Sequence, residues 1–248
     1  MNQEILYGIH PIVEALKARR RKIFECLIAE GNRTARLYEL LAQAGAAGIP
    51  VKKVPPQRLD AVTGSDSHQG IAAVVSPYAT VSIQDLLDRS PVNSRKRLLL
   101  LLDQVVDPHN LGALTRTALC VGIDGIVIPK NRSALPTPAV SKASAGALEH
   151  VRLSKVTNMA DTISLLKKKG LWILGLEKDT DTSLYASDLT GDLAIVIGGE
   201  EKGLRPLVRK KCDYLVSIPQ SAKVNSLNAS VAGAVVMYEA FRQRLVAR

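Results

Sequence analysis

The chain has 248 residues, with 33 basic and 23 acidic side chains and a formal net charge of +10. A hydrophobic fraction of 46% excludes wholesale disorder, and the length allows one large domain or two modest ones. A basic excess of this size favours a polyanionic partner, with nucleic acid first, although a merely solvated basic surface has the same composition.

The three cysteines, Cys26, Cys120 and Cys212, are widely spaced and form no CxxC pair. Their number and spacing argue against a disulfide framework and against structural zinc, so we expect no metal. No basic segment followed by an apolar one opens the chain, and no apolar run reaches membrane-spanning length. We therefore expect a soluble cytoplasmic protein without a membrane partner.

Residues 1–76 have the pattern of a small α/β module. Helices are expected over 8–22 and 35–48, and strands over 24–30, 51–55 and 68–77. The basic run KARRRK, from Lys17 to Lys22, is a candidate for phosphate contact, and a solvated helix end explains it as well. Because only 4% of the residues are aromatic, we expect this module to recognise shape and phosphates rather than stacked bases.

Proline, serine and charged residues dominate 77–96, which predicts a linker. After it, short apolar strands alternate with helices, the pattern of a parallel sheet covered on both faces. The expected strands are 97–105, 122–129, 150–156, 170–177, 192–199 and 214–219, and the expected helices are 110–121, 138–148, 158–169, 204–212 and 226–246. The predicted division is a domain over 1–76, a linker over 77–96 and a second domain over 97–248.

Polar residues and glycines gather near the ends of three of these strands. They are Asn110, Arg116, Gly198, Gly199, Glu200, Ser226 and Asn228. Ligands of open α/β sheets bind beyond the carboxyl ends of the strands, so we expect a site there. The stretch GGEEKGL matches neither GxxxxGK[ST] nor GxGxxG, which argues against a Walker ATPase and a dinucleotide enzyme.

Each of these residues also has a purely structural explanation. Gly198 and Gly199 fit a tight turn, and Asn110 and Ser226 fit helix caps. Arg116 alone fits a surface helix position, with Glu200 as an ion-pair partner. It is the gathering of the whole set at three strand ends that favours a functional site.

Three segments, DPHNLGALTRTA, IGGEEKGL and IPQSAKVNSLNAS, resemble in order and spacing the three motifs of the SpoU (TrmH) ribose 2'-O-methyltransferases. The stretches YGIHPIVEAL and HQGI resemble the ribosomal-protein-like (L30e-like) RNA-binding domain that precedes the catalytic domain in several members. The resemblance covers nearly the whole chain, and it is closest to members that methylate a guanosine ribose of 23S ribosomal RNA. It implies an α/β fold: a SPOUT domain with a parallel sheet and a deep trefoil knot, a bound S-adenosyl-L-methionine, and a homodimer.

The resemblance also implies roles for individual residues. The implied catalytic residues are Asn110, Arg116, Glu200, Ser226 and Asn228, and the implied cofactor-binding residues are Gly198, Ile218 and Leu227. Arg116 is the family's candidate base, but a guanidinium is effectively always protonated in proteins. We therefore expect Arg116 to clamp a phosphate and to stabilise the developing alkoxide. Glu200 would orient Arg116 or hold a donor, and the asparagines and the serine would orient backbone and ribose.

Other functions stay open from the sequence. The same chemistry could act on transfer RNA or on an antibiotic-resistance site of ribosomal RNA, and the chain could bind RNA without catalysis. Transfer-RNA members of the family generally lack a module like 1–76, and the intact polar set argues against a pure binder.

The final helix has two apolar faces, so it needs cover on both. We expect the larger residues to cover the sheet; they are Leu227, Val231, Ala234, Tyr238, Phe241 and Leu245. We expect the smaller residues to contact a symmetric partner; they are Ala229, Ala232, Val236 and Ala240, with Gly233 beside them.

Overall fold

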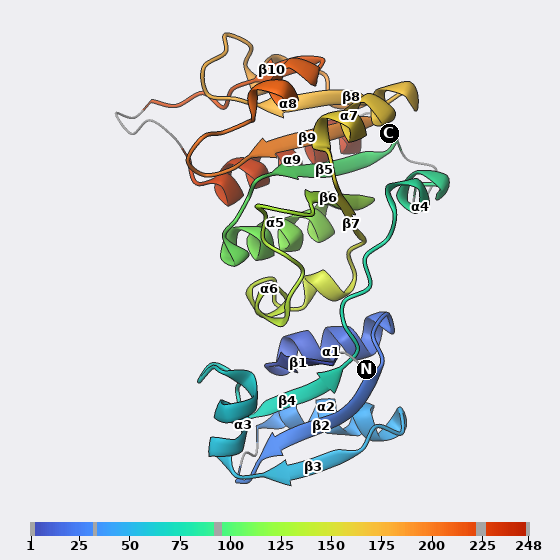
Figure 1. Ribbon diagram of the computed structural model, residues 1–248, viewed down its shortest axis with the longest axis vertical. Coiled ribbons are helices and arrows are strands. Elements are labelled where there is room, and N and C mark those ends of the chain that lie inside the picture. Colours follow the sequence, from blue (N-terminus) through green and yellow to red (C-terminus); the bar gives the residue numbers. More distant parts are fainter. Residues whose placement is uncertain (1–2, 32–33, 92–95, 222–226, 247–248) are drawn as a thin grey trace. The chain divides into compact units, whose positions relative to one another are not determined.

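The computed structural model describes residues 3–31, 34–91, 96–221 and 227–246. The chain folds into two compact units, each an α/β arrangement of its own (Figure 1). Unit 1 comprises residues 1–79 and 136–150, and unit 2 comprises residues 80–135 and 151–248. In the described part of the chain, no helix is both long and apolar enough to cross a membrane.

Unit 1 is built on a four-stranded sheet. Its first elements are β1 (Glu4–Tyr7), α1 (Ile9–Ala18), β2 (Ile23–Ala29), α2 (Ala35–Ala46), β3 (Val51–Val54), α3 (Pro56–Thr63) and β4 (Ile71–Val75). The strand order is β1-β4-β2-β3, with β4 antiparallel to both of its neighbours and β3 parallel to β2. The two helices and three strands predicted for this module are present, and β1 and α3 are additional.

Alternate side chains of strand β2 belong to the two separate cores on the two faces of this sheet. Cys26 and Ile28 belong to the core cluster that includes residues of α1 and α2. Leu27 and Ala29 belong to a second cluster with Leu59 of α3. Since successive side chains of a strand point to opposite faces, one apolar strand serves both layers.

A segment from the second half of the sequence completes unit 1. It contains α6 (Pro138–Ala143) and a 3-10 turn at Ala147–Glu149. Glu149 is buried and accepts a hydrogen bond from Ser141 Oγ at 2.8 Å. His150 Nε2 lies 2.7 Å from Glu14 Oε2 of α1. The predicted boundaries at 76 and 97 do not anticipate this grouping, because contacts distant in sequence produce it.

The basic run at Lys17–Lys22 is only partly a surface feature. Arg21 is buried, forms an ion pair with Glu4 and lies 3.6 Å, NH1 to Oε1, from the buried Glu149. The Arg20 guanidinium lies 5.5 Å from the centroid of the Tyr78 ring. Neither phosphate contact nor a solvated helix end, the two expectations for this run, describes Arg21, which instead pairs with the partly buried Glu4 and lies near the buried Glu149.

Replacing Arg21 with methionine is expected to lower the free energy of unfolding by about 3–5 kcal/mol, because it removes the positive charge beside the buried Glu149 carboxylate. Burial raises the pKa of Glu149, with the Arg21 charge opposing that rise. In the variant, Glu149 can avoid an uncompensated buried charge only by taking up a proton. The loss is therefore expected to grow as the pH rises above the ordinary pKa of a glutamate, and urea unfolding at pH 5 and pH 8 measures it.

The matched control is Arg19→Met, because Arg19 is exposed in the same run. Its unfolding free energy is expected to stay within about 0.5 kcal/mol of the wild type. Equal losses in both variants would contradict a structural role for Arg21.

Unit 2 is built on a six-stranded sheet. Its elements are α4 (Ile83–Asp88), β5 (Leu98–Asp103), α5 (Pro108–Val121), β6 (Gly125–Pro129), β7 (Leu153–Val156), α7 (Met159–Lys168), β8 (Trp172–Leu176), β9 (Leu193–Gly198), α8 (Pro206–Lys211), β10 (Tyr214–Val216) and α9 (Ala229–Val246). The strand order is β10-β8-β9-β5-β6-β7, and every neighbouring pair is parallel. The predicted parallel sheet is confirmed.

Helices cover both faces of this sheet (Figure 1). Residues of α4, α7 and α8 share one core cluster with alternate residues of the strands. Helices α5 and α9 pack against each other, and α9 also packs against β9. Leu86 of α4 is buried in this core, so the stretch predicted as a linker over 77–96 includes a folded helix of unit 2.

The structure reverses the predicted orientation of α9. Gly233, Val236 and Ala240 are buried, whereas Val231 is 49% and Tyr238 51% exposed. The reason is a close crossing with α5, since a Cβ on Gly233 would lie 2.3 Å from Leu114 Cδ2. Only small side chains fit at a crossing this close, so the bulkier stripe faces outward.

Candidate active site

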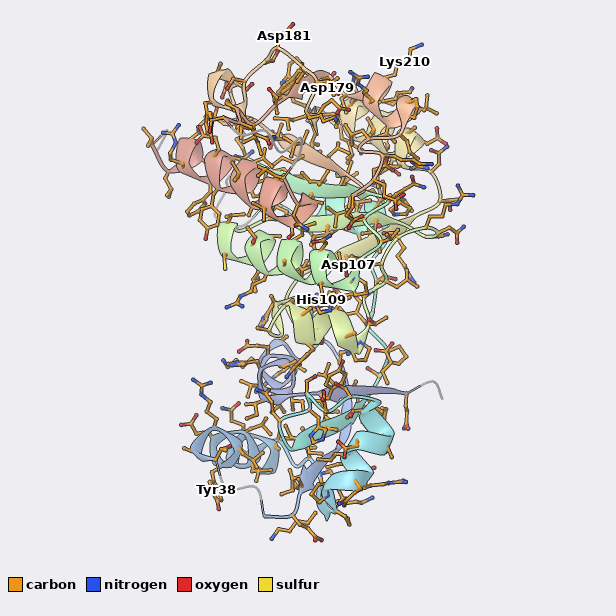
Figure 2. The ribbon with its side chains drawn as sticks, turned by 90° about the vertical axis from the view of Figure 1, so that its left-hand side faces the viewer. Tyr38, Asp107, His109, Asp179, Asp181 and Lys210 are labelled. Atoms are coloured by element: carbon orange, nitrogen blue, oxygen red, sulfur yellow. The ribbon has the colours of Figure 1, made fainter. Side chains whose placement is uncertain are left out.

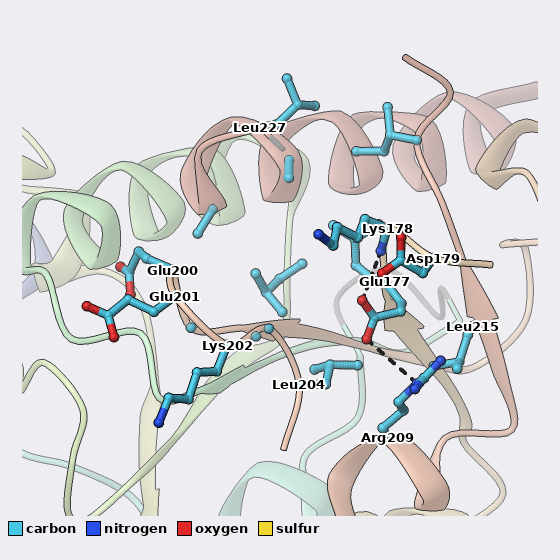
Figure 3. A pocket seen from close by; sticks show the side chains of 18 of the residues that line it. Glu177, Lys178, Asp179, Glu200, Glu201, Lys202, Leu204, Arg209, Leu215 and Leu227 are labelled. Atoms are coloured by element: carbon cyan, nitrogen blue, oxygen red, sulfur yellow. Dashed lines mark hydrogen bonds and ion pairs between the residues drawn. The ribbon is translucent and has the colours of Figure 1, made fainter. Parts of the chain in front are cut away.

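A cavity of about 790 Å³ lies at the carboxyl ends of β8, β9 and β10. Its walls come from 176–179, 197–204, α8, the segment after β10 and the start of α9 (Figure 3). This is the edge at which open parallel sheets bind ligands, and the volume suits a small-molecule cofactor. Gly198, Ile218, Leu227 and Glu200, all singled out from the sequence, line it.

Gly198 and Gly199 form part of the cavity wall. Neighbouring backbone passes so close to both residues that a side chain would not fit. A Cβ on Gly198 would lie 2.2 Å from the carbonyl carbon of Gly203 and 2.4 Å from Leu204 N. A Cβ on Gly199 would lie 2.5 Å from Gln104 O. Gly203 N donates to Gly199 O at 3.0 Å, and Gly203 has a φ of +62°. The tight turn considered from the sequence is therefore present, and it forms one wall of the pocket.

An ion pair between a buried aspartate and a partly exposed arginine stabilises the end of this turn. Asp103, the last residue of β5, is fully buried and lies opposite Gly198 in the sheet register. Arg205 donates to it from the backbone N at 3.1 Å and from Nε at 2.8 Å, and Arg205 NH2 lies 2.6 Å from Oδ1. Sequence reasoning missed this pair, although a lone aspartate ending the run LLLLLD was a usable signal.

Asn110 and Glu200 meet at the mouth of the cavity. Asn110 Nδ2 donates to Glu200 Oε1 at 2.7 Å, and the asparagine is buried. The N-cap of α5 is Asp107, which accepts from His109 N at 2.9 Å; both lie at the start of α5 in Figure 2. Asp107 is therefore the residue that caps α5. Asn110 is not the cap, because its side-chain amide is hydrogen-bonded to Glu200.

Arg116 lies elsewhere on α5. It is exposed and is not among the described residues that line the cavity. Among the described residues, Glu200 pairs with Asn110 rather than with Arg116. The ion pair between Glu200 and Arg116 considered from the sequence is therefore not formed within this chain.

Asn228 takes the structural role that the sequence suggested for Ser226. Its Oδ1 accepts from Ser230 N at 2.8 Å and from Ser230 Oγ at 2.6 Å, which caps α9. Asn228 is exposed, and its neighbour Leu227 lines the cavity. Ser226 lies outside the described residues.

The cavity wall carries charges of both signs. Four carboxylates and four cationic side chains line it: Glu177, Asp179, Glu200, Glu201, Lys178, Lys202, Arg209 and Lys210. Glu200 and Glu201 lie at one side, and Glu177 lies at the other, with its Oε2 3.7 Å from Arg209 Nε (Figure 3). No group of three or more potential metal ligands occurs among the described residues.

Comparisons with known proteins agree with this geometry. The family model SpoU rRNA Methylase matches residues 97–238, and the model RNA 2'-O ribose methyltransferase substrate binding matches residues 5–81. The chain is 44% identical over 242 residues to 23S rRNA (guanosine-2'-O-)-methyltransferase RlmB of Shewanella oneidensis, covering 98% of each chain. It is 40% identical over 249 residues to the protein of the same name from Pseudomonas putida, covering 99% of this chain and 98% of the relative.

The fold is similar to the crystal structure of the SpoU methyltransferase AviRb from Streptomyces viridochromogenes in complex with the cofactor AdoMet. The TM-score is 0.82 at 23% identity, covering 98% of this chain and 91% of the other. The family model alone spans more than half of the sequence, and the relatives are similar over nearly all of it. The chain therefore belongs to the SpoU rRNA methylase family.

Proposed function

We propose that this protein transfers a methyl group from S-adenosyl-L-methionine to the ribose 2'-hydroxyl of a guanosine in 23S ribosomal RNA. The hydrogen bond between Asn110 and Glu200 carries the proposal, because it joins two motifs of the family at the mouth of a glycine-walled cavity. The RNA and the nucleotide follow the names of the relatives from Shewanella oneidensis and Pseudomonas putida. The cofactor follows the AdoMet complex of AviRb.

The residues of the cavity suit this cofactor. Ile218, Leu227 and Leu204 offer apolar contact for an adenine ring. The carboxylates and cationic side chains of the wall match the ammonium, carboxylate and sulfonium groups of the methionine half. Gly198 and Gly199 leave the neighbouring backbone open to a ligand. When bound, the cofactor supplies an electrophilic methyl group.

The chain must position the 2'-hydroxyl and favour loss of its proton. Because Asn110 Nδ2 donates to Glu200, the Asn110 amide is held in one orientation, and its Oδ1 is left to accept from the ribose hydroxyl. Arg116 would donate a charge-assisted hydrogen bond to the developing alkoxide or to the adjacent phosphate. The proton would leave to a phosphate oxygen or to water. Ser226 and Asn228 would orient the ribose and backbone beside them.

Several finer features follow from membership of the family. We assign RNA binding to 1–76 with an L30e-like fold, a connecting role to 77–96 and catalysis to 97–248. The family models over 5–81 and 97–238 support a division near these positions, and α4 within the connecting stretch packs on unit 2. We further assign a deep trefoil knot to the carboxyl-terminal part of the sheet. The convergence of the segments after β8, β9 and β10 on one cavity supports that assignment. A cytoplasmic location fits action on ribosomal RNA.

We also propose a homodimer that uses the outward stripe of α9, which includes Val231, Tyr238 and Leu245, together with Leu227 just before the helix. Arg116 lies on α5, which packs beside α9, so a partner seated there would bring a second Arg116 near the shared face. Val231→Arg is expected to convert the dimer to monomer at micromolar concentration, because the arginine would be desolvated at the contact. Sedimentation velocity measures this change.

The control is Val246→Arg, since Val246 is the most exposed large apolar residue of α9 and lies outside the stripe. This variant should sediment like the wild type. If the wild type sediments as a monomer, the proposed dimer is wrong. If Val231→Arg remains a dimer, the dimer contact does not use this stripe of α9.

Methyl transfer to defined RNA tests the proposed function. With labelled S-adenosyl-L-methionine and 23S ribosomal RNA from a strain lacking this protein, label is expected at the 2'-oxygen of one guanosine. The same RNA with 2'-deoxyguanosine at that position should accept none. Transfer to transfer RNA alone would support the rival substrate, and cofactor binding without transfer to either RNA would support a non-catalytic binder.

A further inference from the structure

A second cavity, of about 390 Å³, lies at the opposite ends of the same strands. Trp172, Leu193 and Tyr214 line it, and these are the first residues of β8, β9 and β10. The remaining lining residues are Ser187, Asp188, Gly191 and Asp192. We call this feature the Trp172 cavity. It is separated from the cofactor pocket by the length of the sheet.

Trp172 presents a large apolar ring to solvent. It is 59% exposed, whereas the next two residues of β8, Ile173 and Leu174, are fully buried. It is also the only tryptophan of the chain. An indole ring left exposed beside a cavity is a flat surface on which a planar group can stack.

Asp188, which lines the same cavity, offers a hydrogen-bond acceptor. Asp188 Oδ1 accepts from Thr190 Oγ1 at 2.7 Å and from Thr190 N at 2.9 Å, and these bonds lower the pKa of Asp188. Tyr214 donates from its hydroxyl to Asp188 O at 3.4 Å. Burial raises the pKa of Tyr214, with Asp188 and Asp213 adding to the rise, so the hydroxyl stays neutral. The Asp188 carboxylate is therefore held in place and ionised, and its Oδ2 can accept from a ligand.

The described lining of the cavity carries two carboxylates, Asp188 and Asp192, and no cationic side chain, so contacts to phosphates would come from lysines close by in the sequence. Lys168 and Lys169 are exposed and precede Trp172 by four and three residues. Lys96 Nζ lies 3.7 Å from Asp192 Oδ2, an exposed pair that partly neutralises that carboxylate. The chain as a whole carries +10. Phosphate attraction by exposed lysines and base stacking on an aromatic ring are the two means by which proteins bind single-stranded nucleic acid.

We propose that the Trp172 cavity binds an unpaired nucleobase of the RNA substrate, stacked on Trp172 and donating N–H groups to Asp188. The proposal rests on the proposed function, to which it adds a second RNA contact outside residues 1–76. Guanine should bind best, because its N1–H and N2–H₂ donors lie side by side and match a carboxylate. Lys168 and Lys169, which precede Trp172 in the chain, would hold the flanking phosphates.

Because the chain has a single tryptophan, its fluorescence reports on this cavity alone. Full-length protein is titrated with a ten-nucleotide single-stranded RNA rich in guanine, with the same strand in a duplex, and with GMP. The single strand is expected to quench the tryptophan emission. The duplex, whose bases are stacked inside, should not quench it, and GMP should quench it at a higher concentration than the single strand. Equal quenching by GMP and the single strand would assign the cavity to a free nucleotide, overturning the RNA contact.

Variants test the two groups that define the cavity, with labelled single-stranded RNA and anisotropy as the readout. Trp172→Leu should weaken binding at least about fivefold, the lower range for loss of a stacked base, and Trp172→Phe should restore part of it. Asp188→Asn should weaken guanine-rich RNA more than uridine-rich RNA. Asp161→Asn, an exposed carboxylate on α7, is the matched control and should bind like the wild type.

Cofactor titration of each variant verifies that unit 2 is folded. Unchanged RNA affinity in folded Trp172→Leu would overturn the proposal, as would quenching by an arginine-rich peptide but not by RNA. Neither readout requires methyl transfer. A protein that binds the single strand at Trp172 and transfers no methyl group would therefore refute the proposed function and leave this contact in place.

Discussion

Arg116→Ala is expected to lower methyl-transfer turnover by about 100- to 1,000-fold, the range for removing one donor that stabilises a developing oxyanion. Cofactor affinity should stay within about threefold of the wild type, because the interaction belongs to the transition state. The structure supports this separation, since Arg116 is exposed on α5 and does not line the described cofactor cavity. Single-turnover rates at saturating RNA and calorimetric cofactor titration give the two quantities.

Arg116→Lys separates charge from geometry. Lysine keeps the positive charge and loses the planar fork, so turnover should lie between those of the wild type and the alanine variant. Arg89→Ala, which removes an exposed arginine of the same unit, serves as the control and should leave turnover unchanged. Substantial methylation by Arg116→Ala at saturating RNA would end the proposed role.

Much of the fold could be predicted because most of its strands are short and strongly apolar. The run LLLLL in β5 is entirely buried, and such a short apolar run is typical of a strand covered on both faces. β1 and α3 escaped prediction for the opposite reason. β1 has four residues, and α3 buries only Leu59, so neither shows a readable periodicity.

The candidate site likewise has features that the sequence predicts and others that it does not. The strand-end rule predicts where Gly198 and Glu200 meet, because all strands of a parallel sheet end at one edge. The run LLLLLD marks Asp103 as unusual, but its partner Arg205 lies about a hundred positions away, and no local pattern identifies that partner. The orientation of α9 was predicted wrongly because both of its faces are apolar, and the crossing with Leu114 on α5 decides which one is buried.

Gly198→Ala is expected to weaken S-adenosyl-L-methionine binding by about 100-fold, equivalent to the upper overpacking cost of about 3 kcal/mol. The added methyl group would stand 2.2 Å from the Gly203 carbonyl carbon, and that carbon is backbone. Rotation of a side chain cannot relieve the clash. The turn over 198–203 must shift, and with it Glu200 and its hydrogen bond to Asn110. Calorimetric titration of the cofactor measures the loss.

The control for this prediction is Gly45→Ala in α2, where an added Cβ meets nothing within 4 Å. Cofactor affinity should be unchanged there, and the helix should gain up to about 1 kcal/mol because alanine is the better helix former. Wild-type affinity in Gly198→Ala would mean that the turn yields easily and is not a fixed wall of the pocket. Mixing these two impaired variants, at a cofactor concentration too low for Gly198→Ala to bind it, then tests whether this wall and Arg116 act in the same subunit. In a heterodimer of Gly198→Ala and Arg116→Ala, one pocket is intact and only the other subunit carries Arg116. Recovery of activity would place Arg116 across the dimer contact, whereas inactive heterodimers would place each complete site within one chain.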